Sequence, residues 1–256
     1  VGIMLSCGEL TLNYALILYD KSKSKIEIVR EIAEELPQAP VLSYFLCDSW
    51  YTCDKIVSAF EKKGFRTIGA VRTNRLVRCE GGKAQIGQLI HSLLLAGVTP
   101  DLVTVRKKQF FVWRMETSLK GIANAVVLIS YPRDAVGVAS ALRAFLSTDT
   151  SLSTMTILDF YAKRWDIEVF FRQVKQKLAL NKYQIRSAVG IQRFWTLMSL
   201  AYLMCCLESE RMSFTDGYAL FQKAIKTERV EFIYRCAHDQ LPVEKAVALL
   251  PDFCAI

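Results

Sequence analysis

The segment YAKRWDIEVFFRQVK, residues 161–175, decides how the fold of this chain is interpreted. It contains neither Gly nor Pro, so the sequence predicts one continuous helix. At about 100° per residue, charged and phenolic side chains share one helix face, and apolar side chains line the adjacent face. The first set consists of Tyr161, Arg164, Glu168, Arg172 and Lys175, and the second of Ile167, Phe171, Val174 and Leu178.

The charged face of this helix has two interpretations. Most such stripes are solvated surface, and that interpretation stays open here. The other follows from the setting of Glu168, a single carboxylate among cationic and phenolic groups at the edge of the apolar face. This arrangement suits a carboxylate that holds a divalent metal while its neighbours bind phosphates.

Composition indicates a folded protein with basic surface. The 256 residues include 33 Lys and Arg against 25 Asp and Glu, which gives a net charge of +8, and 52% are hydrophobic. This balance favours a polyanionic partner, with nucleic acid ahead of a membrane. The longest apolar run, residues 194–207, is shorter than the roughly 20 residues of a bilayer span, and we expect a core helix there.

Cysteine and histidine usage argues against a zinc site and against histidine-based catalysis. Eight cysteines are present without a CxxC pair, and there are only two histidines, which disfavours a zinc site and histidine-based catalysis. Several cysteines lie in apolar runs (FLCD, YLMCCL), so we expect buried thiols in a reducing cytosol. The protein is therefore expected to be cytoplasmic.

The order of elements predicts an α/β fold with parallel neighbouring strands. A turn around Gly8-Glu9 separates the first two strands, and Asp48 follows a buried apolar strand at its C-terminal end. An Asp in this position is either a ligand of a site beyond the strand or the N-cap of the next helix. The expected strands are 3–8, 11–19, 41–47, 66–72, 102–106, 109–116 and 125–130. Residues 49–64 are expected to form a turn and then a helix that ends at Gly64. The other expected helices are 25–36, 86–95, 161–175 with a helical segment leading into it from Thr154, and 187–210, with smaller helices in 211–256.

The spacing of Tyr161, Arg164, Glu168 and Lys175 resembles the Y-(2)-R-(3)-E-(6)-K signature of DDE transposases of bacterial insertion sequences, the insertion-sequence-4 type. The string DSWY at 48–51 resembles the segment that carries the family's second catalytic Asp. The string VRTNR at 71–75 resembles the family's next segment, with Arg72 where Lys is expected. The resemblance covers most of residues 1–210.

The resemblance implies an RNase H-like mixed sheet flanked by helices, with a β-rich insertion before the Glu-bearing helix. The implied parts are a first core segment (1–78), the insertion (79–150), returning core helices with the catalytic Glu (151–210) and a helical tail (211–256). Three carboxylates would hold two Mg²⁺ ions, for which Mn²⁺ substitutes, to cleave and join DNA in cut-and-paste transposition. The implied partners are the transposon ends and the target, both double-stranded DNA, bound by a homodimer. The resemblance also implies a bacterial protein that is nucleoid-associated when it is bound to DNA.

Individual residues take roles from the resemblance or from charge. Asp48 corresponds to the second catalytic Asp and Glu168 to the catalytic Glu, so both are implied metal ligands. Tyr161, Arg164 and Lys175 correspond to DNA-contacting residues. Charge adds Arg172 and the run with Arg72, Asn74 and Arg75, which either follows a DNA backbone or is solvated.

Three tryptophans have expected roles as well. Trp113 lies in the insertion, where related transposases stack a Trp on a flipped base; packing on a β face is the alternative. Trp50 and Trp165 flank the two carboxylates and are expected to support the site by packing.

The first catalytic Asp of the family has no match in this chain. Asp20 follows a predicted strand, but a helix comes directly after it, and Glu9 lies in a turn. We therefore expect a chain that begins after the family's first strand and that cleaves DNA poorly or not at all. The alternatives are a non-catalytic DNA-binding remnant of the same fold and an RNase H-like nuclease without strand transfer.

Overall fold

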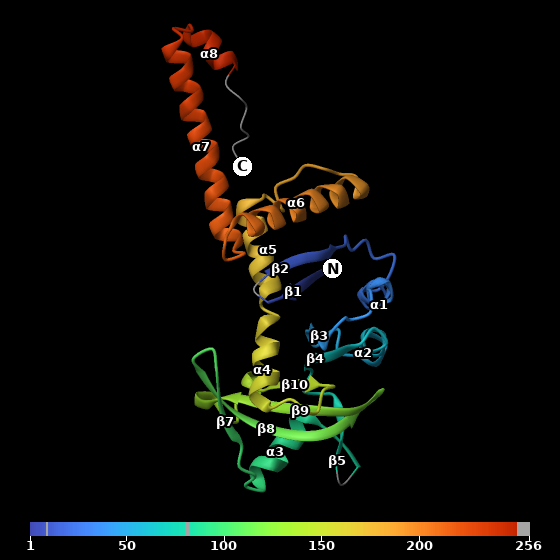
Figure 1. Ribbon diagram of the computed structural model, residues 1–256. Coiled ribbons are helices and arrows are strands. Elements are labelled where there is room, and N and C mark those ends of the chain that lie inside the picture. Colours follow the sequence, from blue (N-terminus) through green and yellow to red (C-terminus); the bar gives the residue numbers. More distant parts are fainter. Residues whose placement is uncertain (9, 80–81, 250–256) are drawn as a thin grey trace. The chain divides into compact units, whose positions relative to one another are not determined.

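The computed structural model describes residues 1–8, 10–79 and 82–249. Within these ranges the chain forms two compact units (Figure 1). The sheet unit consists of residues 20–165, and the helical unit combines residues 1–19 with residues 166–256.

The sheet unit is built on a mixed sheet that has eight strands in the part of the chain described. These are β3 (Ser43–Cys47), β4 (Phe65–Val71), β5 (Leu76–Cys79), β6 (Gly82–Gln85), β7 (Asp101–Val105), β8 (Lys108–Leu119), β9 (Ile122–Pro132) and β10 (Arg143–Ser147). Their order is β3-β4-β10-β9-β8-β5-β6, with β7 paired to β8. Strands β3 and β4 run parallel, and the remaining pairs are antiparallel.

Strand β9 lies at the centre of the sheet and is buried on both faces. Successive side chains of a strand point to opposite faces. Accordingly, Val127 and Ile129 join one apolar cluster, whereas Val126 and Leu128 join the other. This explains why the strand is an unbroken apolar run rather than an alternating pattern.

Helices cover both faces of this sheet (Figure 1). They are α1 (Lys25–Glu35), α2 (Asp54–Glu61), α3 (Ile86–Leu95) and α4 (Thr154–Lys163), with short 3₁₀ turns at η1 (Arg133–Ala135) and η2 (Ala139–Ala141). The side chains of α2 and α3 pack in one cluster and those of α4 in the other. Helix α1 begins with a capping box, in which Ser24 and Glu27 satisfy each other's backbone amides.

The helical unit pairs a hairpin with four helices in the residues that are described. These elements are β1 (Gly2–Cys7), β2 (Leu10–Leu16), α5 (Asp166–Lys177), α6 (Ala188–Glu208), α7 (Phe214–His238) and α8 (Val243–Leu249). The core is aromatic: Tyr202 of α6 stacks on Phe214 of α7 with ring centroids 4.6 Å apart and meets Phe170 of α5 edge-on at 4.9 Å. The residues that the structure describes contain no helix with the length and apolar character of a membrane span.

The predicted fold class, a mixed sheet flanked by helices, is confirmed. The strands expected at 102–106, 109–116 and 125–130 correspond to β7, β8 and β9. The first two predicted strands form the antiparallel pair of β1 and β2, although β2 ends at Leu16, and residue 9 of the predicted turn lies outside the described ranges. Strand β3 begins only at Ser43, because Val41 and Leu42 are exposed.

The prediction of one helix over residues 161–175 is wrong. Helix α4 ends at Lys163, its last amides bond three residues back, as in Arg164 N to Tyr161 O (3.0 Å), and α5 begins at Asp166. No Gly or Pro marks the break. The charges do: Lys163 ends one helix and Asp166 begins the next, as the helix dipole favours.

The predicted apolar face of this region also needs correction. The most deeply buried residues of α5 are Phe170 and Val174, both 0% exposed, whereas Phe171 and Ile167 are only partly buried. Because α5 starts anew at Asp166, its buried face is set by contacts within the helical unit and not by the register of α4. Phe170 was absent from the predicted face.

Two further expectations have clear outcomes. The cysteines of the FLCD and YLMCCL runs, Cys47, Cys205 and Cys206, are buried as predicted. The tail does not consist of small helices, because α7 spans 25 residues.

Candidate functional site

Asp48 lies directly after β3, at the C-terminal end of a strand whose parallel neighbour is β4. Its Oδ1 accepts a hydrogen bond from the Trp50 amide (2.8 Å), and its carbonyl oxygen accepts one from the Tyr51 amide (3.1 Å). Asp48 is therefore not the N-cap of α2, a position that Cys53 takes. The side chain is exposed, and only one carboxylate oxygen is engaged by the turn, so the carboxylate can accept a cation from solvent.

The loop after Asp48 is fixed from below by a buried hydroxyl. Thr52 is 2% exposed, and its Oγ1 donates to Ala70 O of β4 (2.7 Å) while lying 3.1 Å from Asp48 O. Close contact with β4 is possible because residue 69 is Gly. A Cβ there would overlap Thr52 Oγ1 and lie 2.8 Å from Cys47 Sγ.

Tyr161 and Arg164 lie near Asp48 within the sheet unit. The Arg164 guanidinium is over the Tyr161 ring, 5.6 Å from its centroid. Burial raises the pKa of Tyr161, and the Asp48 charge adds to this rise while Arg164 opposes it. Burial likewise raises the pKa of Cys47 to about 12, with the same two charges acting in the same senses. The Asp48 carboxylate and the Arg164 guanidinium thus both lie close enough to the Tyr161 phenol to interact with it electrostatically.

The C-terminal end of α4, where this pair lies, is held by a residue of the turn between β7 and β8. The Arg106 guanidinium donates to Ala162 O (2.7 Å), one of the last carbonyl groups of the helix. Cations at a helix C-terminus satisfy such carbonyls and interact favourably with the dipole. Arg106 therefore positions Tyr161 and Arg164 indirectly.

A groove of about 740 Å³ opens beside the Asp48 loop. It lies between the N-terminal turns of α1 and α2 and the loop after β4. Four cationic side chains line it against two carboxylates. The lining residues are Ser24, Ile26, Glu27, Arg30, Ser49, Trp50, Cys53, Asp54, Lys55, Arg72, Asn74 and Arg75.

The predicted basic run therefore borders a groove. Arg72 and Asn74 are exposed, and Arg75 is partly exposed. A turn closed by Arg75 N to Arg72 O (3.0 Å) shapes the run, and the Gly87 amide of α3 bonds to Thr73 O (2.8 Å). The run thus forms a loop whose backbone is held by hydrogen bonds, and whether it binds DNA or is only solvated stays a prediction.

The remaining predicted site residues lie on α5 in the helical unit. Glu168 is in its first turn and partly buried, whereas Arg172 and Lys175 are exposed. Spacings of four and three residues place the three on one helix face. The structure thus brings Asp48 together with Tyr161 and Arg164, and Glu168 together with Arg172 and Lys175, in two different units. Across the described ranges, no group of three or more His, Cys, Asp or Glu side chains is placed to hold a metal ion.

The expected tryptophan roles change. Trp113 is 5% exposed, donates its Nε1 hydrogen to Val98 O (2.9 Å) and meets Tyr131 edge-on, so packing on the sheet is confirmed and a base cannot reach its ring. Trp50 and Trp165 are 55% and 52% exposed, so they are not buried supports.

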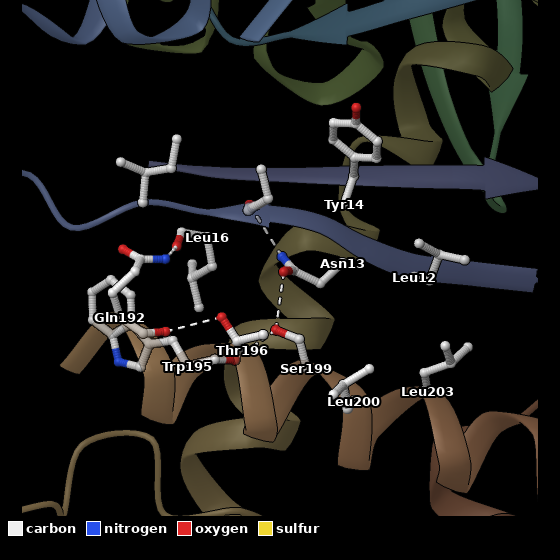
Figure 2. Close-up of a pocket in the computed structure, with 12 residues that line it drawn as sticks. Leu12, Asn13, Tyr14, Leu16, Gln192, Trp195, Thr196, Ser199, Leu200 and Leu203 are labelled. Atoms are coloured by element: carbon white, nitrogen blue, oxygen red, sulfur yellow. Dashed lines mark hydrogen bonds between the residues drawn. The ribbon is translucent and has the colours of Figure 1, made fainter. Parts of the chain in front are cut away.

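A second hollow, of about 310 Å³, lies in the helical unit between β2 and α6 (Figure 2). Gln192 and Ser199 of α6 bond to Leu16 O (2.5 Å) and Asn13 Oδ1 (3.1 Å) of β2. No charged side chain is among its lining residues, so it offers nothing to a polyanion.

One protein-family model matches most of the chain. The family model described as "Transposase DDE domain" matches residues 6–204 of the 256, well over half of the chain. The chain belongs to this family of DDE transposases, whose members act on DNA and generally use divalent metals. No curated protein matches the chain significantly.

Sequence reasoning missed Arg30 and Lys55 of the groove. Lys55 had a weak signal, because it lies in the first turn of the helix that follows Asp48. Arg30 had none, since only the packing of α1 beside α2 brings it to the groove.

Proposed function

We propose that this chain is the catalytic domain of a transposase of the insertion-sequence-4 type, which binds transposon-end and target DNA as a homodimer. The observation that carries the proposal is the Asp48 region. An exposed carboxylate follows the parallel strand β3, the Tyr161–Arg164 pair lies near it, and a basic groove opens beside it. A carboxylate that can bind a divalent metal and cations that can bind phosphates are residues of the kinds that DNA phosphodiester chemistry uses.

Asp48 and Glu168 would hold the divalent metal, Mg²⁺ or Mn²⁺. Carboxylate oxygens are the ligands these hard cations prefer, and the open side of Asp48 fits that use. When bound, such metals activate water or a DNA 3′-hydroxyl and stabilise the leaving oxygen. The chain's own part is to orient the Asp48 carboxylate through the Trp50 amide and to present cations to the phosphates.

The cationic residues would position DNA. Arg164, Arg172 and Lys175 bind phosphates near the cut, and Tyr161 adds a hydroxyl contact. Arg72, Asn74 and Arg75 bind the backbone along the groove. These contacts carry no sequence information, so they suit a catalytic domain that acts wherever other contacts place it.

Cleavage by this chain is proposed to be weak, because only two of the three implied carboxylates have a match. A non-catalytic DNA-binding role is therefore the second candidate function, and the missing third carboxylate favours it. An RNase H-like nuclease without strand transfer would need the Tyr-Arg-Lys set to be incidental.

The metal site is tested by thermal unfolding. With Mn²⁺ at ten times its dissociation constant, binding adds about 1.4 kcal/mol of stability and should raise the melting temperature by several degrees. Asp48→Asn keeps an acceptor for the Trp50 amide but removes the charge, and should abolish the rise. Asp20→Ala, which removes an exposed carboxylate that accepts hydrogen bonds from Ser22 and lies outside the groove and the predicted site, should leave it intact. No rise in the unsubstituted chain would leave only the DNA-binding candidate.

Phosphate contacts are tested by salt dependence. Arg164→Ala and Lys175→Ala should each reduce the slope of log K against log salt for duplex DNA by about 0.9, the value of one lost contact. Lys226→Ala removes an equal charge from the exposed part of α7, outside the matched region, and should leave the slope unchanged. If Arg164→Ala and Lys175→Ala had the same slope as the unsubstituted chain, both residues would be structural and not phosphate contacts.

A further inference from the structure

We propose that Trp50 and Arg72 form a stacking platform for an unpaired base of the DNA strand that lies in the groove. The inference rests on the DNA binding proposed above and adds to it a preferred feature of the ligand, a base outside the duplex stack. It concerns residues to which the family resemblance assigns no base contact.

The backbone of Trp50 is held in place, whereas more than half of the residue's surface is exposed. The Trp50 amide bonds to Asp48 Oδ1 (2.8 Å), and the turn continues through Tyr51 N to Asp48 O (3.1 Å), so the backbone under the ring is fixed. Even so, 55% of Trp50 is exposed. An exposed indole on a fixed turn loses little conformational freedom when a ligand covers it.

Arg72 prepares the same ring for a ligand. Its guanidinium lies over the Trp50 ring, 5.1 Å from the centroid, in a cation–π contact. A guanidinium and an indole in contact can bind nucleic acid in complementary ways. The ring stacks on a base, and the guanidinium binds a phosphate or stacks as well.

The groove supplies the charge that a strand requires. Arg30, Lys55 and Arg75 line it with Arg72, against the carboxylates of Glu27 and Asp54. Glu27 is engaged in the α1 capping box, where it accepts from the Ser24 amide (2.8 Å). The cations therefore dominate the field that a phosphate backbone meets.

The geometry favours an unpaired base over a duplex. Bases inside a duplex stack on one another and present only their edges in the grooves. An indole can take a base face only when that base has left the stack. The apolar area of Trp50, next to cations and beside Asp48, fits a strand that has been opened near the site.

The test is a cycle between protein and DNA. Duplexes with a short single-stranded extension are prepared with one abasic nucleotide moved stepwise along the extension. Trp50→Leu should weaken binding of the intact extension at least about fivefold. With the abasic nucleotide at one particular position, the same substitution should have no effect. Trp50→Phe keeps a ring and should retain most of the affinity.

Control variants separate stacking from charge and from folding. Tyr234→Ala removes an aromatic side chain that is 72% exposed on α7 and should leave affinity unchanged. Arg72→Lys keeps the charge but loses the planar group, and should weaken binding of the intact extension more than that of the abasic one. Melting temperatures of Trp50→Leu and Trp50→Phe should agree, since both change an exposed position.

Two results would be decisive against the platform. One such result is that Trp50→Leu binds every extension as tightly as the unsubstituted chain does, or loses the same affinity wherever the abasic nucleotide is placed. No base would then stack on Trp50, although the proposed DNA binding would stand. If the unsubstituted chain binds no DNA at low salt, the proposed function itself fails.

Discussion

Gly217→Ala is expected to destabilise the helical unit by about 3 kcal/mol, at the upper end of what overpacking costs. Helices α6 and α7 cross with their backbones in contact at this point. A Cβ on Gly217 would overlap the carbonyl oxygen of Cys205 and lie 2.6 Å from its carbonyl carbon. Backbone atoms of a helix cannot turn aside as a side chain can, so the two helices must separate.

The separation would spread through the aromatic core. Phe214, one turn from Gly217, stacks on Tyr202, so any shift of α7 pulls on this pair. Intrinsic helix propensity acts in the opposite sense, since Ala is favoured over Gly by about 1 kcal/mol inside a helix. The steric term is the larger of the two, and the net effect is a loss of stability.

Thermal and urea unfolding followed by circular dichroism measure this change. Gly87→Ala is the matched control, because Gly87 also lies in a helix, and its nearest neighbour to an added Cβ is Thr73 O at 3.5 Å. We expect the control to unfold like the unsubstituted chain or slightly later. If Gly217→Ala did the same, α6 and α7 would not cross at Gly217.

Gly217 also shows why the tail was mispredicted. A Gly within a helical pattern lowers the confidence of a helix prediction, and residues 211–256 were expected to form smaller helices. Here Gly217 lies in the first turn of α7, where it is required by the neighbouring backbone and not by its own conformation. That requirement comes from Cys205 of α6, a different helix, so the sequence around Gly217 carries no sign of it.

The sheet unit was predictable to the extent that its signals are local. The apolar run of β9 and the Ser24–Glu27 capping box are each visible within a few residues. The pairing of β10 with β4 joins residues 143–147 to residues 68–71 and has no local signature. Strand existence was therefore predictable, whereas strand order was not.

In the candidate site, too, the features with a local sequence signal were predictable and the others were not. Asp48 could be placed from the strand that precedes it, and the chain does place it at the end of β3. The break between α4 and α5 was hidden, because helix propensity continues through Arg164 and Trp165 and only the change of charge sign marks it. Tyr161 lies on α4, Arg164 is its C-cap, and the other three residues of the predicted stripe lie on α5, so a single helical wheel does not describe their relation.

Gly69→Ala is the second substitution with a large expected effect, and it acts beneath Asp48. The added Cβ would overlap Thr52 Oγ1 and lie 2.8 Å from Cys47 Sγ, and both of these residues are buried. Thr52 can yield only by giving up its hydrogen bond to Ala70 O (2.7 Å). We expect a loss of about 2 kcal/mol of stability, from overpacking together with a broken buried hydrogen bond.

A double-mutant cycle with Thr52→Ala identifies the cause. Thr52→Ala alone removes the hydroxyl and should cost about 1 kcal/mol. Combined with Gly69→Ala it also removes the overlapping atom, so the double variant should be more stable than the sum of the single losses implies, with a coupling of at least about 0.5 kcal/mol. Additive losses would show that the strain lies at Cys47 instead. Because the Thr52 hydroxyl also fixes the turn that orients the Asp48 carboxylate, Gly69→Ala should reduce the Mn²⁺-induced rise in melting temperature, which a loss of stability elsewhere in the sheet would not do.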